Sequence, residues 1–316
     1  MRLLLTGADG FVGGWLARRL LEGGHSVVGT HRRGGGPSPV LTPLEAARVE
    51  WRELELGSRE SIEGACRGRW DAVVHLAALS SGSEARENPG LAWEVNAAGT
   101  ARLCEVLGLR VVARQSDPNV LLVSTGEVYG AGRGVPRRES DPVLPCSPYS
   151  ASKLASEIAA LEVARRTGLR VIVARPFPHT GAGQDMRFVV PALASRIQAA
   201  RRIGAPTIKT GNLDTVRDFL DVRDVSEAYL TLLERGTIGE TYNIASGEGH
   251  PLTEILQRLE RLARWRVRPE LEPRLARRSD IAHLVGDAGK LRSETGWQPR
   301  IPLDQTLQDL LDAQAD

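Results

Sequence analysis

The chain alternates short, almost wholly apolar runs with longer segments in which apolar residues recur at helical spacing. The first apolar run leads directly into a glycine-rich turn and then into a helical segment. This order predicts an α/β protein built on a Rossmann-type, doubly wound parallel sheet. The expected strands are residues 2–5, 25–30, 72–76, 120–124 and 170–174, and the expected helices between them are residues 11–21, 90–108 and 150–166.

The alternation of apolar strands and helical segments stops after Arg175, where several prolines and glycines lie close together and predict a loop. Helical spacing returns at residues 187–202, 224–235 and 252–264. No low-complexity linker separates the halves, so we expect two lobes that share one cleft. A dinucleotide-binding lobe is predicted to combine residues 1–175 and 212–247, and a smaller, mixed α/β substrate-binding lobe to combine residues 176–211 and 248–316.

Composition and charge argue against several classes of protein. The 316 residues are 41% hydrophobic, yet no apolar run approaches the roughly 20 residues of a membrane span. The net charge of +2 is spread along the chain, which argues against nucleic acid or an anionic membrane as a partner. The first apolar run is too short for a signal peptide, and Cys66, Cys104 and Cys146 lack paired or metal-ligand spacing. We therefore expect a cytoplasmic protein with reduced thiols and no bound metal.

A glycine-rich turn, Thr6–Gly13, joins the first expected strand to the first helix. Gly7, Gly10 and Gly13 are spaced three apart, which permits a tight turn and a close approach of the backbone to a pyrophosphate. The helix that begins near Phe11 and Val12 then offers free N–H groups and a positive dipole end. The turn predicts dinucleotide binding, and the alternative is a merely structural turn.

The end of the second expected strand bears on the choice of cofactor. An NAD site usually has an acidic residue there, whereas a nearby arginine accommodates the 2′-phosphate of NADP. This chain has Arg32 and Arg33 and no carboxylate at that point. We expect NADP(H), with NAD(H) as the alternative if both arginines are only solvated loop charges. Glu55 and Leu56, after the next strand, are candidates for the adenine edge.

Tyr149 and Lys153 lie four residues apart on an expected helix, and therefore on the same face. A lysine ammonium beside a phenol favours the phenolate, so the pair predicts proton transfer by Tyr149. Thr125 follows the strand at 120–124, where a hydroxyl faces the cofactor crevice and can bond a reacting oxygen. Glu127 is a candidate acid or base, and the alternative for this segment is turn chemistry before Gly130.

Taken together, these motifs resemble the extended short-chain dehydrogenases/reductases that act on nucleotide sugars. By that resemblance Tyr149 is the general acid/base, Lys153 lowers its pKa and holds the nicotinamide ribose, Thr125 assists, and Ala77 contacts the cofactor. The resemblance rests on Thr6–Gly13, His75–Ala78, Asn96–Thr100, Ser124–Gly130, Tyr149–Lys153 and Arg217–Phe219.

The downstream segments 174–184, 211–219 and 295–302 resemble GDP-sugar enzymes, namely GDP-mannose 4,6-dehydratases and, more closely, GDP-4-keto-6-deoxy-mannose reductases. The resemblance implies a GDP-sugar substrate and a homodimer. Arginine forks suit a diphosphate. The substrate-binding residues implied are His179, Arg217, Arg277 and Asp280.

Several positions depart from the family pattern: Pro178 replaces a usual Asn, Ala182 a usual proline, Gly126 the Asp of one dehydratase type, and the family's Asp before the third helix is replaced near Gly57–Ser58. The resulting expectation is NADPH-dependent reduction of the C4 keto group of a GDP-4-keto-6-deoxy sugar. The alternatives are a 4,6-dehydratase or a 4-epimerase of a nucleotide sugar. A non-catalytic dinucleotide-binding regulator is a further alternative, disfavoured by the intact Thr125, Tyr149 and Lys153.

Overall fold

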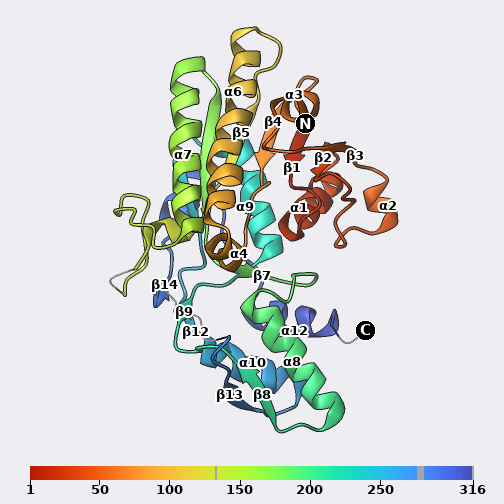
Figure 1. The fold of residues 1–316 in the computed structure, drawn as a ribbon, viewed down its shortest axis with the longest axis vertical. Helices are drawn as coiled ribbons and strands as arrows, with labels where there is room; N and C mark the ends of the chain where they lie inside the picture. Colours follow the sequence, from red (N-terminus) through yellow and green to blue (C-terminus); the bar gives the residue numbers. More distant parts are fainter. Residues whose placement is uncertain (132–133, 276–280, 315–316) are drawn as a thin grey trace.

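The computed structural model describes residues 1–131, 134–275 and 281–314. A seven-stranded parallel sheet forms the larger part of the molecule, with strand order β11-β6-β5-β4-β1-β2-β3 (Figure 1). The order reverses beside β1, as in a doubly wound Rossmann sheet, so the predicted fold is confirmed. The strands are β1 (Arg2–Thr6), β2 (Ser26–His31), β3 (Glu50–Glu53), β4 (Ala72–His75), β5 (Asn119–Val123), β6 (Arg170–Pro176) and β11 (Thr241–Ile244).

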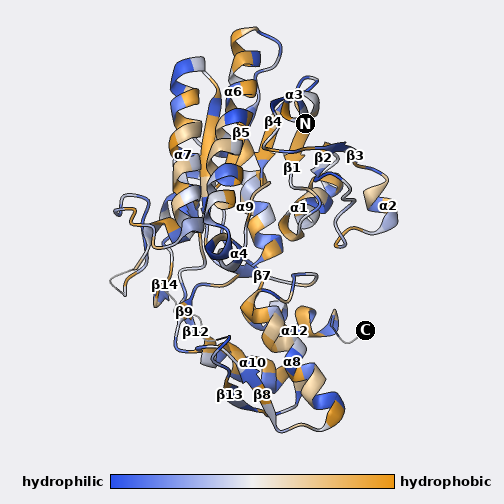
Figure 2. Ribbon diagram, viewed as in Figure 1, coloured by the Kyte–Doolittle hydropathy of each residue, from blue (hydrophilic) through white to orange (hydrophobic). Residues whose placement is uncertain are grey.

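Both faces of the inner strands are buried, which explains why β1, β4 and β5 are largely continuous apolar runs, whereas the edge strand β3 is polar and partly exposed. Leu3 and Leu5 point into one apolar cluster and Leu4 into another, as the two-residue period of a strand requires. Helices cover both clusters, and Figure 2 shows the apolar strands between helices of mixed character. The first cluster packs against α1 (Phe11–Glu22) and α9 (Val222–Arg235), and the second against α3 (Arg59–Ala65), α6 (Gly99–Val112) and α7 (Pro148–Thr167).

Helix α7 has strong start and stop signals. Ser147 caps its N-terminus in a reciprocal capping box with Ser150, and Pro148 occupies the first turn. Gly168, in the left-handed conformation, ends the helix. The helix therefore begins at a defined residue, which fixes Tyr149 in its first turn.

The expected helix at 90–108 is three consecutive pieces. They are α5 (Pro89–Ala92), the π-helix η1 (Trp93–Ala98) and α6. The wide π turn carries Asn96, whose buried side chain bonds the backbone of Leu79 and donates to Ser152 Oγ at 3.0 Å. The Asn96 side chain, carried by this irregular turn, thus links the segment after β4 to α7 at Ser152, the residue before Lys153.

A smaller lobe lies below the sheet in Figure 1 and has an apolar cluster of its own. This lobe contains α8 (Val189–Ile203) and α10 (Leu252–Ala263), which confirm the helices expected at residues 187–202 and 252–264. The helix expected at residues 224–235 is α9, which packs on the sheet. Two-residue strands lie between the lobes. The lobe's other elements are β8 (Thr207–Thr210), β13 (Arg268–Leu271) and α12 (Leu303–Asp312), and the short strands are β7 (His179–Thr180), β9 (Val216–Arg217), β10 (Leu220–Asp221), β12 (His250–Pro251) and β14 (His283–Leu284).

The predicted domain boundaries stay a prediction. Residues of the segment 281–297, which includes α11 (Gly289–Thr295), pack into the first cluster of the sheet, with Leu291 and Trp297 buried there. Among the residues that the structure describes, no helix is both long and apolar enough to cross a membrane.

Candidate active site

The glycine turn forms a tight backbone cradle at the end of β1. Gly7 has a φ of +71°, and a β-carbon on it would lie 2.8 Å from the Ala77 backbone nitrogen. A β-carbon on Gly13 would lie 2.1 Å from the Gly7 carbonyl oxygen. Any side chain at either position would fill the cradle or displace it, so both positions require glycine.

The cradle opens at the N-terminus of α1. Gly10 is the N-cap of α1 and has no side chain that could accept from the first N–H groups of the helix. The first turn, which contains Phe11 and Val12 and is fully described by the structure, carries no acidic residue. Those N–H groups and the helix dipole are therefore available to an anion. The arrangement fits the pyrophosphate of a dinucleotide.

Arg32 and Arg33 follow β2, and both side chains are exposed. Their backbone N–H groups bond two carboxylates that we call the rim of the cradle, Asp9 and Glu55. The Arg33 N–H donates to Glu55 Oε1 at 2.8 Å, and the Arg32 N–H donates to Asp9 Oδ2 at 3.4 Å. Leu56 is buried in the second apolar cluster, where it packs against Gly99. Of the two adenine-edge candidates, Glu55 thus lies at this rim, while the Leu56 side chain mainly fills the core.

Thr125, Glu127 and Tyr149 come together at the carboxyl end of β5, and Lys153 follows Tyr149 by one turn of α7. Thr125 caps the 3-10 turn η2 (Gly126–Tyr129), and its Oγ1 accepts from the Glu127 N–H at 3.2 Å. Both Thr125 and Glu127 act on the Tyr149 phenol, the first through a side-chain hydrogen bond and the second through its charge. The sequence-predicted catalytic residues therefore form one group.

The expected lowering of the Tyr149 pKa by Lys153 is wrong for this arrangement. Burial raises the pKa of Tyr149, the negative charge of Glu127 raises it further, and the Thr125 hydrogen bond only partly opposes them. Part of the Tyr149 surface nevertheless remains accessible. Tyr149 is therefore a phenol at neutral pH, ready to donate a proton.

Lys153 is almost fully buried, one helical turn beyond Tyr149. Burial lowers its pKa to about 8, while the nearby carboxylate of Glu157 raises it. Lys153 is therefore mostly protonated at neutral pH and titrates within the range in which enzymes work.

His75 has a structural position. Its Nδ1 lies 2.8 Å from Thr6 Oγ1 and its Nε2 lies 2.9 Å from Thr100 Oγ1, so the ring connects β4 to β1 and α6. Burial lowers its pKa to about 3, with the charge of Lys153 adding to the effect. The imidazole is therefore neutral, and Thr6 Oγ1 also accepts from the Ala77 N–H at the cradle.

The predicted substrate residues lie only partly within the described chain. Arg217 is half-buried on β9, donates to the Val216 and Ile281 carbonyls at 2.8 and 2.9 Å, and is influenced by the charge of Glu127. His179, on β7, donates from Nδ1 to the Phe177 carbonyl at 3.0 Å. Arg277 and Asp280 lie outside the described residues.

The loop after β7 rests on the cofactor half of the molecule. Trp15 of α1 donates from Nε1 to the Ala182 carbonyl at 3.1 Å, and a β-carbon on Gly183 would lie 3.1 Å from Val40. Within the loop, Gln184 bonds Thr180 and the His179 carbonyl. The predicted cofactor and sugar regions are thus in direct contact.

The sequence model of the GDP-mannose 4,6 dehydratase family matches residues 4–310. The chain belongs to this family. Membership confirms the resemblance to extended short-chain dehydrogenases/reductases and identifies the chain as an enzyme of that type.

Individual relatives have more than one activity. GDP-6-deoxy-D-mannose reductase of Pseudomonas aeruginosa is 34% identical over 98% of this chain and 96% of that protein. UDP-glucose 4-epimerase of Streptomyces lividans is 30% identical over 94% of this chain and 91% of that protein. The solved structure of RMD from Pseudomonas aeruginosa, complexed with NADPH, has a TM-score of 0.85 at 31% identity, covering 99% of this chain and 98% of that one.

Behind the residues predicted for this dehydratase-family site lies a buried polar network that the sequence did not predict. Glu157 of α7 pairs with Arg175 of β6 and accepts from Ser124, while Arg175 also donates to the Tyr129 hydroxyl. Asn243 of β11 accepts from that hydroxyl at 2.8 Å. In the sequence, the only nearby indication of this network is Glu157 itself, a charged residue four positions after Lys153 and therefore on the same buried face of the helix.

Proposed function

We propose that the protein reduces the C4 keto group of a GDP-4-keto-6-deoxy sugar with NADPH. The similarity to GDP-6-deoxy-D-mannose reductase along 98% of the chain carries this proposal. Gly126 argues against one alternative, the dehydratase type that carries Asp at this position, because a β-carbon there would lie 2.9 Å from the Phe177 ring. The Asp that one dehydratase type carries at this position does not fit without displacement of that ring.

In this proposal the glycine cradle and the α1 N-terminus hold the pyrophosphate, and Lys153 holds the nicotinamide ribose. The chemistry that a bound nicotinamide supplies is hydride transfer. Tyr149 donates its phenolic proton to the oxygen that develops negative charge at C4, and Thr125 hydrogen-bonds the same oxygen. The raised pKa of Tyr149 suits this acid role, since the proton is present at neutral pH.

The preference for NADPH over NADH rests on Arg32 and Arg33, which are exposed where a 2′-phosphate would lie. RMD was solved with NADPH, which supports the same choice. Changing both arginines to alanine should abolish the difference in affinity between the two cofactors, measured by fluorescence titration. Equal affinities in the unmodified protein would contradict the preference.

Two observations favour alternatives. Glu127 is a carboxylate beside the Tyr149 phenol, where it could serve as the base that removes a carbon-bound proton of the sugar in a dehydratase, and the identity to a UDP-glucose 4-epimerase is 30%. A non-catalytic regulator would not need the grouping of Thr125, Tyr149 and Lys153.

The deciding experiment supplies GDP-4-keto-6-deoxy-mannose with NADPH and follows cofactor absorbance and product mass. The reductase proposal predicts stoichiometric NADPH consumption and only a modest loss of rate in Glu127→Gln. Loss of water from GDP-mannose alone, without NADPH consumption, would assign the chain to the dehydratases. Interconversion of a UDP-sugar would favour the epimerase.

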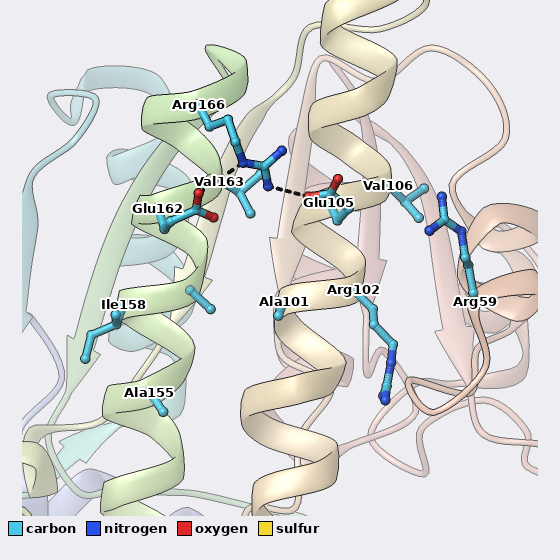
Figure 3. A pocket seen from close by; sticks show the side chains of 11 residues that line it. Arg59, Ala101, Arg102, Glu105, Val106, Ala155, Ile158, Glu162, Val163 and Arg166 are labelled. Atoms are coloured by element: carbon cyan, nitrogen blue, oxygen red, sulfur yellow. Dashed lines mark hydrogen bonds and ion pairs between the residues drawn. The ribbon is translucent and has the colours of Figure 1, made fainter.

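A second copy of the chain is the partner we propose, in a cytoplasmic homodimer. A groove of about 540 Å³ lies along α6 and α7, away from the catalytic residues. Figure 3 shows Arg166 of α7 reaching Glu105 of α6, and both signs of charge line the groove around alanines. A surface that carries both signs of charge can pair with its own copy across a two-fold axis, which supports this proposal.

Ile158, 62% exposed on α7, should be buried in that dimer. Ile158→Glu should then halve the mass measured by light scattering, because it would place a charge in the interface. Leu44→Glu, at an even more exposed apolar position on α2 (Pro43–Ala46), should not. A monomeric unmodified protein would contradict the homodimer.

A further inference from the structure

Glu157 is a carboxylate buried to 3% exposure in the centre of the molecule. Its Oε1 accepts from Arg175 Nε at 3.0 Å and from the Ser124 hydroxyl, and its Oε2 accepts from Arg175 Nη2 at 2.7 Å. A buried ion pair costs desolvation energy, and an apolar pair of similar volume is often equally stable. The stability of the core alone therefore does not explain this pair.

The contacts of Glu157 connect the elements that carry the catalytic group. Ser124 immediately precedes Thr125 at the end of β5, so the bond from Ser124 to Glu157 holds that strand end against α7. Arg175 extends the connection to β6 and, through Tyr129, to Asn243 on β11. One carboxylate thus fixes the relative placement of Thr125 and the helix of Tyr149.

Glu157 also lies one helical turn beyond Lys153, with the catalytic pair on the same face of α7. The groups that act on the lysine come from several elements. The neutral His75 faces it from β4, and the carboxylate of Glu157, itself paired with Arg175 of β6, supplies the charge that favours its ammonium form. The charge of Glu127, from η2, acts on the Tyr149 phenol.

We propose that Glu157 is a positioning residue of this active site, which holds the Thr125 strand end in place through Ser124 and keeps Lys153 as an ammonium beside Tyr149. Its role in turnover rests on the proposed function. Its effect on Lys153 does not, and can be measured without any substrate.

The lysine content of the chain makes this measurement unusually clear. Only three of its 41 basic residues are lysines: Lys153, Lys209 and Lys290. Lysine labelled with carbon-13 at the ε-carbon should give three NMR signals, and two of them belong to surface ion pairs, with Glu272 and Glu240. Lys209→Arg and Lys290→Arg assign the signals.

In Glu157→Gln the Lys153 signal should titrate at a pH lower by on the order of one unit, because a nearby negative charge is lost. The Lys209 and Lys290 signals should not move. Glu63→Gln, which removes an exposed carboxylate of α3, is the matched control and should leave all three signals unchanged.

Glu157→Gln leaves the Arg175 charge without its partner and can unfold the chain. Glu157→Gln combined with Arg175→Met removes both charges and should give the same direction of shift for Lys153. Ser124→Ala keeps the ion pair, so it should leave the Lys153 titration unchanged but lower kcat about tenfold, with KM for the sugar within twofold.

The rate profile gives the second readout. The alkaline loss of kcat in Glu157→Gln should move to lower pH by the same amount as the Lys153 titration, since Lys153 loses its proton earlier. An unchanged Lys153 titration in both folded charge variants overturns the inference, whatever reaction the protein catalyses. A shifted titration without any keto-sugar reduction instead overturns only the proposed reductase.

Discussion

At the scale of single residues, burial and the neighbouring carboxylates together set the charge state of the site. Tyr149 is kept as a phenol by desolvation and by Glu127, and Lys153 is moved toward neutrality by desolvation and held as an ammonium by Glu157. At neutral pH Tyr149 is therefore a neutral phenol and Lys153 is mostly an ammonium, so both side chains are protonated when a catalytic cycle starts. That state suits protonation of a product oxygen by Tyr149.

Tyr149→Phe removes the proton donor and little else, because the ring keeps its packing. Turnover should fall by about 10²–10⁴-fold, the usual range for a general acid. The melting temperature and the affinity for the cofactor should stay close to those of the unmodified protein. A variant that retains more than about a tenth of the rate would contradict the assignment of Tyr149 as the acid.

His75 should make stability depend on pH. Its pKa is about 3 in the folded chain against an ordinary value of 6.5, so below pH 6.5 the unfolded chain binds a proton that the folded chain does not. This contribution to stability is present at neutral pH and decreases as the pH falls through 6.5. Between pH 7 and pH 5 the loss should be about 2 kcal/mol.

The measurement is urea unfolding at both pH values, with His75→Gln as the comparison, since glutamine bonds both threonines without titrating in this range. The unmodified protein should lose about 2 kcal/mol more than the variant. Equal losses in the two proteins would show that His75 is protonated in the folded state.

The parts of the site that are encoded locally were predictable, and the rest were not. The glycine turn and the Tyr149–Lys153 pair depend on residues a few positions apart, so their spacing reveals them. The Glu157 network joins residues from α7, β5, β6 and β11, and only the folded sheet brings them together. The direction of the Tyr149 pKa shift was mispredicted because burial is a property of the whole fold.

At the scale of elements, the glycine turn sets a strict steric limit. Gly13→Ala should lower the melting temperature and abolish dinucleotide binding, because its β-carbon would lie 2.1 Å from the Gly7 carbonyl oxygen. Gly64→Ala is the control: this glycine lies in α3, and a β-carbon added to it would meet no heavy atom within 4 Å. That change should stabilise the protein by about 0.4–1 kcal/mol. Similar effects of the two changes in thermal melting would contradict the steric argument.

The long buried strands and capped helices were predictable because their apolar runs and capping residues are continuous in the sequence. The π turn at η1 was not, since it depends on Asn96 reaching Leu79 and Ser152. The two-residue strands between the lobes also left no pattern. Each of them pairs with a segment distant in the sequence, as β7 does with β10.

At the scale of the whole molecule, ligand binding should be detectable as stability. If Arg217 grips the diphosphate of a GDP-sugar, GDP should raise the melting temperature by several degrees, because a ligand at about 100 times its Kd adds roughly 2.7 kcal/mol. UDP should raise it less, and Arg217→Gln should reduce the effect of both. A larger shift with UDP would favour the epimerase and count against a GDP-sugar substrate.

The pairing of β11 with β6 has a consequence for synthesis of the chain on the ribosome. Strand β6 is complete at Pro176, but its outer neighbour begins only at Thr241, after the chain has passed through α8 and β8 of the smaller lobe. Until then the nascent sheet has an open, apolar edge, which favours aggregation and chaperone binding. Fragments that stop before residue 241 should therefore be recovered mainly in inclusion bodies, even though they contain the whole glycine turn and the Tyr149–Lys153 pair.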